Sequence, residues 1–370
     1  MSENKKILIL HGSNDLYGAS KVLIEVINLL FEKGFEIHLI LPYKGPLDII
    51  LEKRTIIVYK SLGVFRKKYF NLLGLINRFQ KVLSSVFFIN KLIKNNNIDI
   101  VYTNTSVIIA GGISAKINSL ISCFHIHEIP TNKFYLSIIK KIIDLTSDKV
   151  VVVSKAVKNH WNFDLKSKTK IIYNGFDLGT VPKVNKSLKD RTVFTSIGRL
   201  IPYKGHLYLL EIAKKLKEKN FEFIFYIIGD TFPGYENYES LLKDFVIENN
   251  LGDSVVFTGF KNNVSSYLKK SDFFIHTAIQ PDPLPTVILE SIILDIPVIA
   301  TNLGGAKEIL NHGKAGLLIP ENSVESSVNS ILAFVNNKQE VLKRKINAKQ
   351  HFIKYFSKEK FNKKILSLFE

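Results

Sequence analysis

Short apolar runs along the chain alternate with longer stretches in which apolar residues recur every three or four positions. The run Lys6–Leu10 is typical of a buried strand, and a Gly-containing loop follows it over residues 11–18. Residues 19–33 are predicted to form a helix that ends at Gly34, and residues 35–41 a second strand. One face of this helix would carry the apolar side chains Val22, Leu23, Val26, Ile27, Leu30 and Phe31. This order is a βαβ unit, which begins a parallel sheet.

The same alternation occurs twice along the chain. Further strands are predicted over residues 98–102, 122–126, 149–153, 193–197, 223–228, 255–258, 273–276 and 297–300. We therefore predict an α/β fold of two Rossmann-like, doubly wound parallel-sheet domains that face an interdomain cleft. The domains are expected at residues 1–178 and 190–350, and a terminal helix over 351–370 is expected to pack back on the first domain. Ligands of such sheets bind beyond the carboxyl ends of the strands.

Composition narrows the class of protein. Of the 370 residues, 46% are hydrophobic, which allows each half its own core. Cys123 is the single cysteine, so an internal disulfide is excluded and a cysteine-based metal site is not expected. The first residues lack the pattern of a secretory signal, and no apolar run reaches the ~18 residues that span a bilayer. A cytoplasmic protein is therefore expected.

The second half contains an acid pair next to a predicted helix start. Asp282 and Glu290 stand eight positions apart, and Leu284-Pro285-Thr286 is predicted to lead into a helix that begins near Thr286. The backbone N–H groups of Thr286 and Val287 would then be free to bind an anion. A carboxylate one turn into the helix could bind two vicinal hydroxyls of a ribose. Taken alone, Glu290 also fits a solvated acid on a helix, and Asp282 also fits a turn-forming residue.

Two cations follow the first strand of the second half. Gly198 allows a tight turn, and Arg199 and Lys204 could hold a diphosphate. Because the chain is rich in lysine, the alternative is a pair of ordinary surface cations.

The first half offers weaker candidates. Gly18 precedes a helix N-terminus, where backbone N–H groups could approach a phosphate. His125 and His127 are expected to point to opposite sides of the extended chain, so that only one of them faces the cleft; His127 is preferred and His125 is the rival. Ser154 fits a helix N-cap and Asn174-Gly175 a turn, both structural roles.

Taken in order, these segments resemble glycosyltransferase family 4, the retaining enzymes of GT-B fold also described as glycosyl transferases group 1. The resemblance covers nearly the whole chain and is most specific in the second half. Its motifs there are Gly198-Arg199-Leu200, Lys204-Gly205, Ile228-Gly229-Asp230, Phe257-Thr258-Gly259, the acid pair, and the run Asn302-Leu303-Gly304-Gly305-Ala306-Lys307-Glu308.

The resemblance also implies roles for single residues. Arg199 and Lys204 would hold the donor diphosphate, Gly18 would approach its β-phosphate, and Glu290 would bind the donor ribose. Asp282 would contact the donor sugar, at a position where the family usually has Glu. His127 would be the histidine of the amino-terminal cleft. Leu284, Pro285, Thr286 and Val287 would complete the donor site.

The activity implied by the resemblance is retaining transfer of a sugar from a UDP- or GDP-sugar to a glycan or lipid-linked glycan, in bacterial surface polysaccharide biosynthesis. The first domain would bind the acceptor and the second the nucleotide-sugar. No metal and no cofactor are expected, because Arg, Lys and helix N-termini offset the charge of the leaving diphosphate. Two alternatives are a GT-B nucleotide-sugar epimerase and a non-catalytic partner of a transferase.

The formal net charge of +18 is typical of a protein with an anionic partner. The alternative is that it reflects a composition rich in Lys, Ile and Asn and has no function. Residues 65–94 combine Phe and Leu with the cations Arg66, Lys67, Lys68, Arg78, Lys81, Lys91 and Lys94. A basic amphipathic helix of this kind can bind an anionic membrane surface at the inner face of the cell membrane. The alternative is an ordinary crossover helix with lysines outside. Nucleic acid is not expected as a partner, because no known nucleic-acid-binding module is present.

Overall fold

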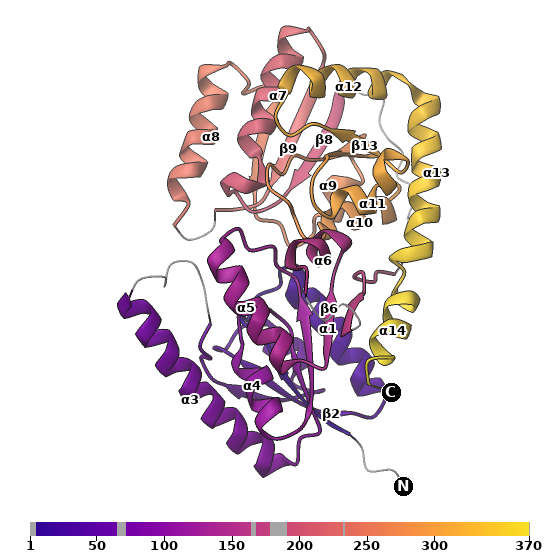
Figure 1. Ribbon diagram of the computed structural model, residues 1–370. Helices are drawn as coiled ribbons and strands as arrows, with labels where there is room; N and C mark the ends of the chain where they lie inside the picture. The colour runs from indigo at the N-terminus through magenta and orange to yellow at the C-terminus, as the bar shows by residue number, and fades with distance from the viewer. Residues whose placement is uncertain (1–4, 65–71, 164–167, 178–190, 232–233, 370) are drawn as a thin grey trace. The chain divides into compact units, whose positions relative to one another are not determined.

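A computed structural model describes residues 5–64, 72–163, 168–177, 191–231 and 234–369. The chain divides into two compact units (Figure 1). Unit 1 comprises Met1–Gly175 together with Glu359–Glu370, and unit 2 comprises Phe176–Lys358. The expected terminal segment over 351–370 therefore divides between the units, because its first residues still belong to a helix of unit 2. The stretch between the two expected domains, residues 179–189, lies outside the described residues.

Unit 1 is built on a seven-stranded sheet in the order β3-β2-β1-β4-β5-β6-β7, with every neighbouring pair parallel. The order reverses between β1 and β4. Its elements are β1 (Lys6–Leu10), α1 (Gly18–Glu32), β2 (Glu36–Leu41), α2 (Pro46–Leu51), β3 (Ile56–Tyr59), α3 (Leu72–Asn96), β4 (Ile100–Thr103), α4 (Ala110–Ile117), β5 (Ile121–Ile126), α5 (Lys133–Thr146), β6 (Lys149–Val152), α6 (Lys155–Trp161) and β7 (Thr169–Ile171).

Alternate side chains of β1 fill two separate cores, because successive residues of a strand point to opposite faces. Ile7 and Ile9 pack with α1, whereas Leu8 and Leu10 pack with α3 and α4. Figure 1 shows α3, α4 and α5 together on the second of these faces. One side chain of the predicted apolar face of α1 was assigned wrongly: Phe31 lies near the helix end and is 46% exposed.

Unit 2 has a six-stranded parallel sheet in the order β10-β9-β8-β11-β12-β13. The order reverses between β8 and β11. Its elements are β8 (Thr192–Ile197), η3 (Pro202–Lys204), α7 (His206–Glu218), β9 (Phe223–Ile228), α8 (Glu236–Glu248), β10 (Val255–Gly259), α9 (Ser265–Leu268), β11 (Phe273–His276), α10 (Thr286–Ile293), β12 (Val298–Thr301), α11 (Ala306–Ile309), η4 (Asn311–Gly313), β13 (Leu317–Ile319), α12 (Val324–Asn336) and α13 (Lys338–Tyr355). The predicted fold class, two doubly wound parallel-sheet domains, is confirmed.

The sequence reasoning missed the strands β3, β7 and β13. Each has only three or four residues, and the burial of β3 and β13 is incomplete. An apolar run of that length at a sheet edge carries little signal, because one side of an edge strand has no partner to demand burial.

The end of the chain returns to unit 1. The last helix, α14 (Lys358–Leu366), begins three residues after α13 ends. Phe361, Ile365, Leu368 and Phe369 join the core cluster that contains Ile7 and Ile9. The carbonyl oxygens of Phe369 and Leu368 accept hydrogen bonds from the ammonium groups of Lys5 and Lys149.

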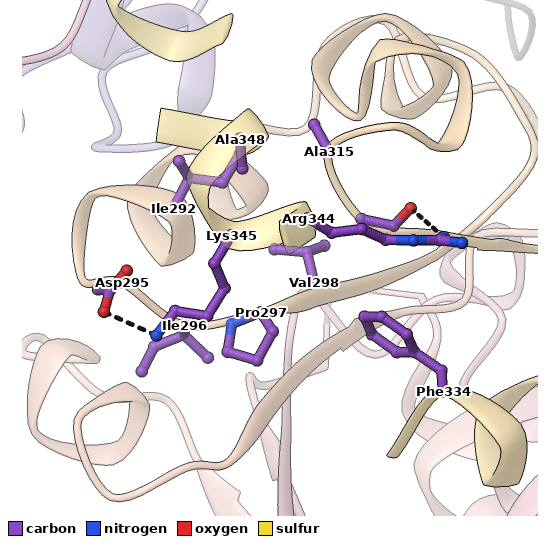
Figure 2. Close-up of a pocket in the computed structure, with 11 residues that line it drawn as sticks. Ile292, Asp295, Ile296, Pro297, Val298, Ala315, Phe334, Arg344, Lys345 and Ala348 are labelled. Atoms are coloured by element: carbon purple, nitrogen blue, oxygen red, sulfur yellow. Dashed lines mark hydrogen bonds and ion pairs between the residues drawn. The ribbon is translucent and has the colours of Figure 1, made fainter. Parts of the chain in front are cut away.

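A small cavity of about 10 Å³ lies in unit 2 between α13 and the segment that joins α10 to β12. Figure 2 shows the side chain of Lys345, from α13, directed at Asp295. Lys345 Nζ lies 2.7 Å from Asp295 Oδ2. Arg344 donates from Nη1 to the carbonyl of Gly316 at 2.9 Å. A space of that size holds about one water molecule. The two contacts join α13 to the segments that precede β12 and β13, and the cavity is too small for a sugar nucleotide.

The predicted basic helix corresponds to α3, which begins at Leu72. Arg66, Lys67 and Lys68 lie outside the described residues. Arg78 is only 9% exposed, so this cation belongs to the packed side of the helix. Of the helices that the structure describes, none combines the length and the apolar run needed to cross a bilayer.

Candidate active site

The strand order of unit 2 reverses between β8 and β11. The predicted cations follow the first of these strands, and the first predicted acid follows the second. β8 ends at Ile197, and Arg199 and Lys204 follow within its loop and η3. β11 ends at His276, and Asp282 follows in the next loop. Since β8 and β11 are neighbours in the sheet, their carboxyl ends open at one place. This is the switch point at which doubly wound sheets bind ligands.

Lys204 and Asp282 form a close ion pair. Lys204 Nζ donates to Asp282 Oδ2 at 2.5 Å, and the two side chains are 18% and 12% exposed. Burial by itself would raise the pKa of Asp282, but the positive charges of Lys204 and Arg199 and the nearby His276 lower it. Asp282 is therefore held as a carboxylate. The sequence did not predict this pairing, because 78 positions separate the two residues.

Two glycines explain how the loops come so close. Gly205 has φ +72°, and a Cβ there would stand 1.8 Å from the carbonyl oxygen of Thr277. Gly304 has φ +53°, and its Cβ would stand 2.3 Å from the carbonyl oxygen of Asp282. Only glycine tolerates this backbone and this approach. The motif residues Gly205 and Gly304 thus fix the loops that carry Lys204 and Asp282.

The predicted helix start is α10, which begins at Thr286 with Pro285 as its N-cap residue. The N–H groups of Thr286 and Val287 stand in the first turn, ahead of the first i→i−4 hydrogen bond. Leu284 is 5% exposed, so its side chain packs inward and only its backbone could face a ligand. Glu290 lies one turn further on and is partly exposed.

Two buried histidines beside the ion pair were not singled out from the sequence. His276 Nε2 lies 3.8 Å from Asp282 Oδ2, and His206 Nε2 donates to the carbonyl of Arg199 at 3.0 Å. Burial lowers the pKa of each to about 4, so both rings are neutral at pH 7. The position of His276 at the end of a buried strand, one of the two at the switch point, is the signal that could have identified it.

In unit 1, the expectation that His125 and His127 point to opposite sides was wrong. Residues two apart in an extended chain share a face, and the two ring centroids lie 4.2 Å apart. His125 is fully buried, and its Nδ1 lies 2.6 Å from the hydroxyl of Tyr102. His127 is partly exposed, at the carboxyl end of β5. Of the pair, His127 is the one that a ligand could reach.

The backbone around His127 is held by Glu128. The Glu128 carboxylate accepts hydrogen bonds from the hydroxyl of Thr105, from the hydroxyl and N–H of Ser106, and from the N–H of His127. The backbone carbonyl of Glu128 accepts a hydrogen bond from the indole N–H of Trp161 at 2.9 Å. Burial raises the pKa of Glu128, although these donors favour the carboxylate.

The ring of His127 contacts a polar cluster that the sequence reasoning missed. Asn104 follows β4, and His11 follows β1, so both stand at the switch point of unit 1. Asn104 Oδ1 lies 3.0 Å from His127 Nε2, and Asn104 Nδ2 lies 3.2 Å from His11 Nδ1. The signal available in the sequence was their position, directly after two apolar strands.

Gly18 is the first residue of α1. A Cβ at this position would meet nothing within 4 Å, and its φ is not positive. Neither packing nor backbone conformation within the chain therefore requires glycine there. The predicted role, close approach of a phosphate, stays a prediction.

Of the two structural roles predicted for Ser154 and Asn174-Gly175, the structure shows the first and not the second. Ser154 is the N-cap of α6, and its hydroxyl accepts from the N–H of Val157 at 3.1 Å, as predicted. No turn is assigned at Asn174-Gly175. Asn174 is instead 4% exposed, and its Oδ1 has no hydrogen-bond partner among the described residues.

An open hollow of about 920 Å³ lies elsewhere in unit 2, between η4, β13 and α13. None of the predicted site residues lines it. Within the part of the chain that the structure describes, no three histidine, cysteine or carboxylate side chains gather as metal ligands would.

Two family models match the chain with little overlap. The model described as Glycosyltransferase Family 4 matches residues 17–180, and the model described as Glycosyl transferases group 1 matches residues 180–355. The chain is a family 4 glycosyltransferase. The first match falls mainly on unit 1 and the second on unit 2.

Curated relatives of this glycosyltransferase include two from bacteria. The UDP-Gal:alpha-D-GlcNAc-diphosphoundecaprenol alpha-1,3-galactosyltransferase of Escherichia coli is 27% identical over 347 residues, covering 87% of this chain and 86% of the relative. The capsular polysaccharide biosynthesis glycosyltransferase CapH of Staphylococcus aureus is 27% identical over 250 residues, covering 63% of this chain and 68% of the relative.

Solved structures share the fold of the transferase. HepE of Anabaena, in complex with UDP and glucose, superposes with a TM-score of 0.80 at 22% identity and covers 99% of both chains. The lipopolysaccharide outer core galactosyltransferase WaaB, in its apo form, gives a TM-score of 0.76 at 17% identity, over 98% of this chain and 99% of WaaB. At these identities the likeness establishes the GT-B fold and no more.

Proposed function

We propose that the enzyme transfers a sugar from a nucleotide-diphospho-sugar to a lipid-linked or polysaccharide acceptor, with retention of the anomeric configuration. The observation that carries this proposal is the buried Lys204–Asp282 pair beside Arg199 at the switch point of unit 2. Two cations at the carboxyl ends of parallel strands are suited to a diphosphate. A UDP-sugar is the first donor to test, since HepE binds UDP and glucose and the Escherichia coli relative uses UDP-Gal.

In this proposal the diphosphate is the leaving group, and unit 2 supplies its stabilisation. Arg199 and Lys204 bind the phosphate oxygens, and the N–H groups of Thr286 and Val287 add the positive end of the α10 dipole. Lys204 then interacts with both the phosphate and Asp282. The carboxylate of Asp282 accepts hydrogen bonds from sugar hydroxyls. Glu290 accepts from the ribose hydroxyls. No metal ion is required, because these cationic groups offset the developing charge.

Unit 1 would supply neutral contacts to the reacting sugar. His127 is within reach of a ligand and is uncharged at pH 7, because burial and the neighbouring His125 and His11 hold its pKa well below the usual value. Gly18 would let the backbone at the start of α1 approach the β-phosphate.

Two measurements test this function. A thermal-shift series with UDP, GDP and their sugars should raise the melting temperature for the true donor, since a ligand that binds only the native state stabilises it. Incubation with that donor and a polyprenyl-diphosphate sugar should then give a product whose new linkage has the donor's anomeric configuration. An inverted linkage, or conversion of the donor without any acceptor, would contradict the proposal.

We also propose that unit 1 docks on an anionic membrane through α3 and α5. Ile76, Phe79, Leu83 and Phe87 form an exposed stripe on α3, with spacings of three or four residues that place them on one helix face. On α5, Phe134, Ile138 and Leu145 are likewise exposed. The exposed lysines of α3 are Lys81, Lys91 and Lys94. An apolar stripe next to cations is the pattern of an interfacial helix, and an undecaprenol-linked acceptor would lie in such a membrane.

Liposome flotation tests the docking. Changing Lys81, Lys91 and Lys94 to glutamate should abolish flotation with phosphatidylglycerol-containing vesicles. The same change at Lys214, Lys338 and Lys349, three exposed lysines of unit 2, alters the net charge equally and should leave flotation intact. Equal flotation of the two triple variants would rule the docking surface out.

A further inference from the structure

The polar cluster around Asn104 has a definite hydrogen-bond direction. The Asn104 amide nitrogen, Nδ2, lies 3.3 Å from the carbonyl oxygen of Ala19, which can only accept. The NH₂ group must therefore point toward Ala19, and the oxygen Oδ1 must point the other way, toward His127. Because Oδ1 can only accept, the His127 Nε2 at 3.0 Å has to carry the proton of that hydrogen bond.

The rest of the cluster agrees with this direction. The same NH₂ group faces Nδ1 of His11 at 3.2 Å, so that nitrogen accepts and the proton of a neutral His11 ring is on Nε2. Nε2 of His11 lies 3.0 Å from the hydroxyl of Ser20, and this hydroxyl donates to Asp15 Oδ1 at 2.8 Å. Hydrogen bonds therefore run from Asn104 to His11, from His11 to Ser20 and from Ser20 to Asp15. Each donor has an acceptor, and the last acceptor is the carboxylate of Asp15.

We propose that Asn104 is a positioning residue that holds His127 as the neutral Nε2–H tautomer and so leaves Nδ1 as a hydrogen-bond acceptor for a sugar hydroxyl. This inference rests on the proposed function, in which His127 faces the reacting sugar. Asn104 itself is fully buried and does not reach a ligand. His127 is partly exposed, and its Nδ1 has no hydrogen-bond partner among the described residues. Which ring nitrogen of a histidine carries the proton is set by the partner of the other nitrogen.

The arrangement excludes His127 as a proton donor at neutral pH. Burial lowers the pKa of His11 to about 4, against the opposing effects of Asp15 and the Asn104 backbone, and the pKa of His127 is also well below its usual value. A neutral ring whose single N–H proton is directed at Asn104 can orient a hydroxyl of the sugar through Nδ1. It cannot protonate the departing diphosphate.

The first experiment reads the tautomer directly and does not depend on activity. Long-range ¹H–¹⁵N correlation spectra of histidine-labelled protein distinguish Nε2–H from Nδ1–H rings. The chain has nine histidines, and the His127 signals are identified by their loss in His127→Gln. The wild type should show His127 as Nε2–H at pH 7. A ring that is Nδ1–H, or doubly protonated, would overturn the proposal even if the enzyme transfers sugar as proposed.

The second experiment uses the isosteric variant Asn104→Asp. A carboxylate next to His127 and His11 favours their charged forms, so it should raise the pKa of His127 and move the acidic limb of the kcat/KM profile to higher pH by about one unit or more. Asn118→Asp adds the same charge to unit 1 at a side chain that contacts Asn90 and the Ser114 carbonyl, and it should leave the profile where it is.

The outcomes separate the inference from the proposed function. A uniform loss of activity at every pH in Asn104→Asp, with an unmoved profile, would mean that Asn104 only supports the fold. If the variant does not fold, Ser20→Ala interrupts the cluster further away, and the proposal then expects a mixture of His11 tautomers with His127 still Nε2–H. Failure of sugar transfer with the expected tautomer would reject the function and not the tautomer.

Discussion

The two sheets of this glycosyltransferase present very different chemistry at the same topological place. At the switch point of unit 2, a lysine and an aspartate form a nearly buried ion pair with an arginine nearby. At the switch point of unit 1, Asn104 connects His127 to His11, and both rings are neutral at pH 7. The fold provides the location in both units, but the residues directly after the strands decide whether it is charged or neutral.

The difference is consistent with the proposed function, in which unit 2 binds a diphosphate and unit 1 contacts a sugar. A diphosphate needs fixed positive charge, whereas a sugar ring offers neutral hydroxyls that need oriented acceptors. Burial has a different electrostatic effect at each site. It makes the paired charges of unit 2 interact strongly, and in unit 1 it removes charge from the histidines. Substitutions in one unit at a time therefore test this difference.

The largest effect is expected from Lys204→Met. The variant leaves Asp282 buried without its cation, which costs about 3–5 kcal/mol of stability, and it removes a charge from the diphosphate site, which should lower kcat/KM by about 100- to 1,000-fold. The double variant Lys204→Met/Asp282→Asn should recover stability but not activity. Melting temperatures and donor kinetics measure the two effects separately. If the double variant recovers both, Lys204 serves only the fold.

Glu290→Gln should have the next largest effect. Replacing the carboxylate by an amide weakens its hydrogen bonds to ribose hydroxyls, since a bond to a charged group is worth about 1.5–3 kcal/mol. This corresponds to about a 10- to 100-fold rise in the dissociation constant of the nucleoside diphosphate. Calorimetric titration measures it, with Glu218→Gln, an exposed acid of α7, as the control. Unchanged affinity would remove Glu290 from the donor site.

Much of the charged site could be predicted from the sequence, because its residues belong to ordered motifs. Nearby residues in the sequence are enough to single out Arg199, Lys204 and Asp282, and also the start of α10. Their pairing is not local, since it depends on the order β8-β11 in the sheet. The neutral site was harder to predict: Asn104 and His11 belong to no motif and gain a role only because β1 and β4 are neighbours. The expectation that His125 and His127 point to opposite sides was wrong, because residues two apart in an extended chain share a face.

Acid should weaken unit 1 through its buried histidines. Burial lowers the pKa of His125 to about 3, so below pH 6.5 the unfolded chain binds a proton that the folded ring does not. Each such histidine removes about 1.4 kcal/mol of stability per pH unit as the pH falls. His125→Gln should reduce this slope by that amount between pH 6 and 4.5. Urea unfolding followed by the single tryptophan, Trp161 of α6, reports on unit 1.

The carboxylate of unit 2 responds to pH in a different range. The folded pKa of Asp282 is below the unfolded value of about 3.9, so its contribution is fully present above that value and is lost only as the pH falls through the folded pKa. Asp282→Asn should therefore leave the slope between pH 6 and 4.5 unchanged. An equal change of slope in His125→Gln and Asp282→Asn would contradict the assignment of charge to the two sites.

The smallest effect is expected from a pair of glycine substitutions. Gly18→Ala adds a methyl group into open space, so it should leave the melting temperature unchanged and weaken donor binding by about three- to tenfold, up to about 1.4 kcal/mol. Gly205→Ala should destabilise unit 2, because its Cβ would collide with the carbonyl of Thr277. Normal donor affinity in Gly18→Ala would show that no phosphate approaches the start of α1.

The most direct test of the charged site is a crystal structure of the wild-type enzyme with UDP, or with GDP if the thermal-shift series selects it. We expect the diphosphate within hydrogen-bond distance of Arg199 and Lys204, with a ribose hydroxyl on Glu290. A diphosphate bound away from these residues, or one that contacts only unit 1, would contradict it.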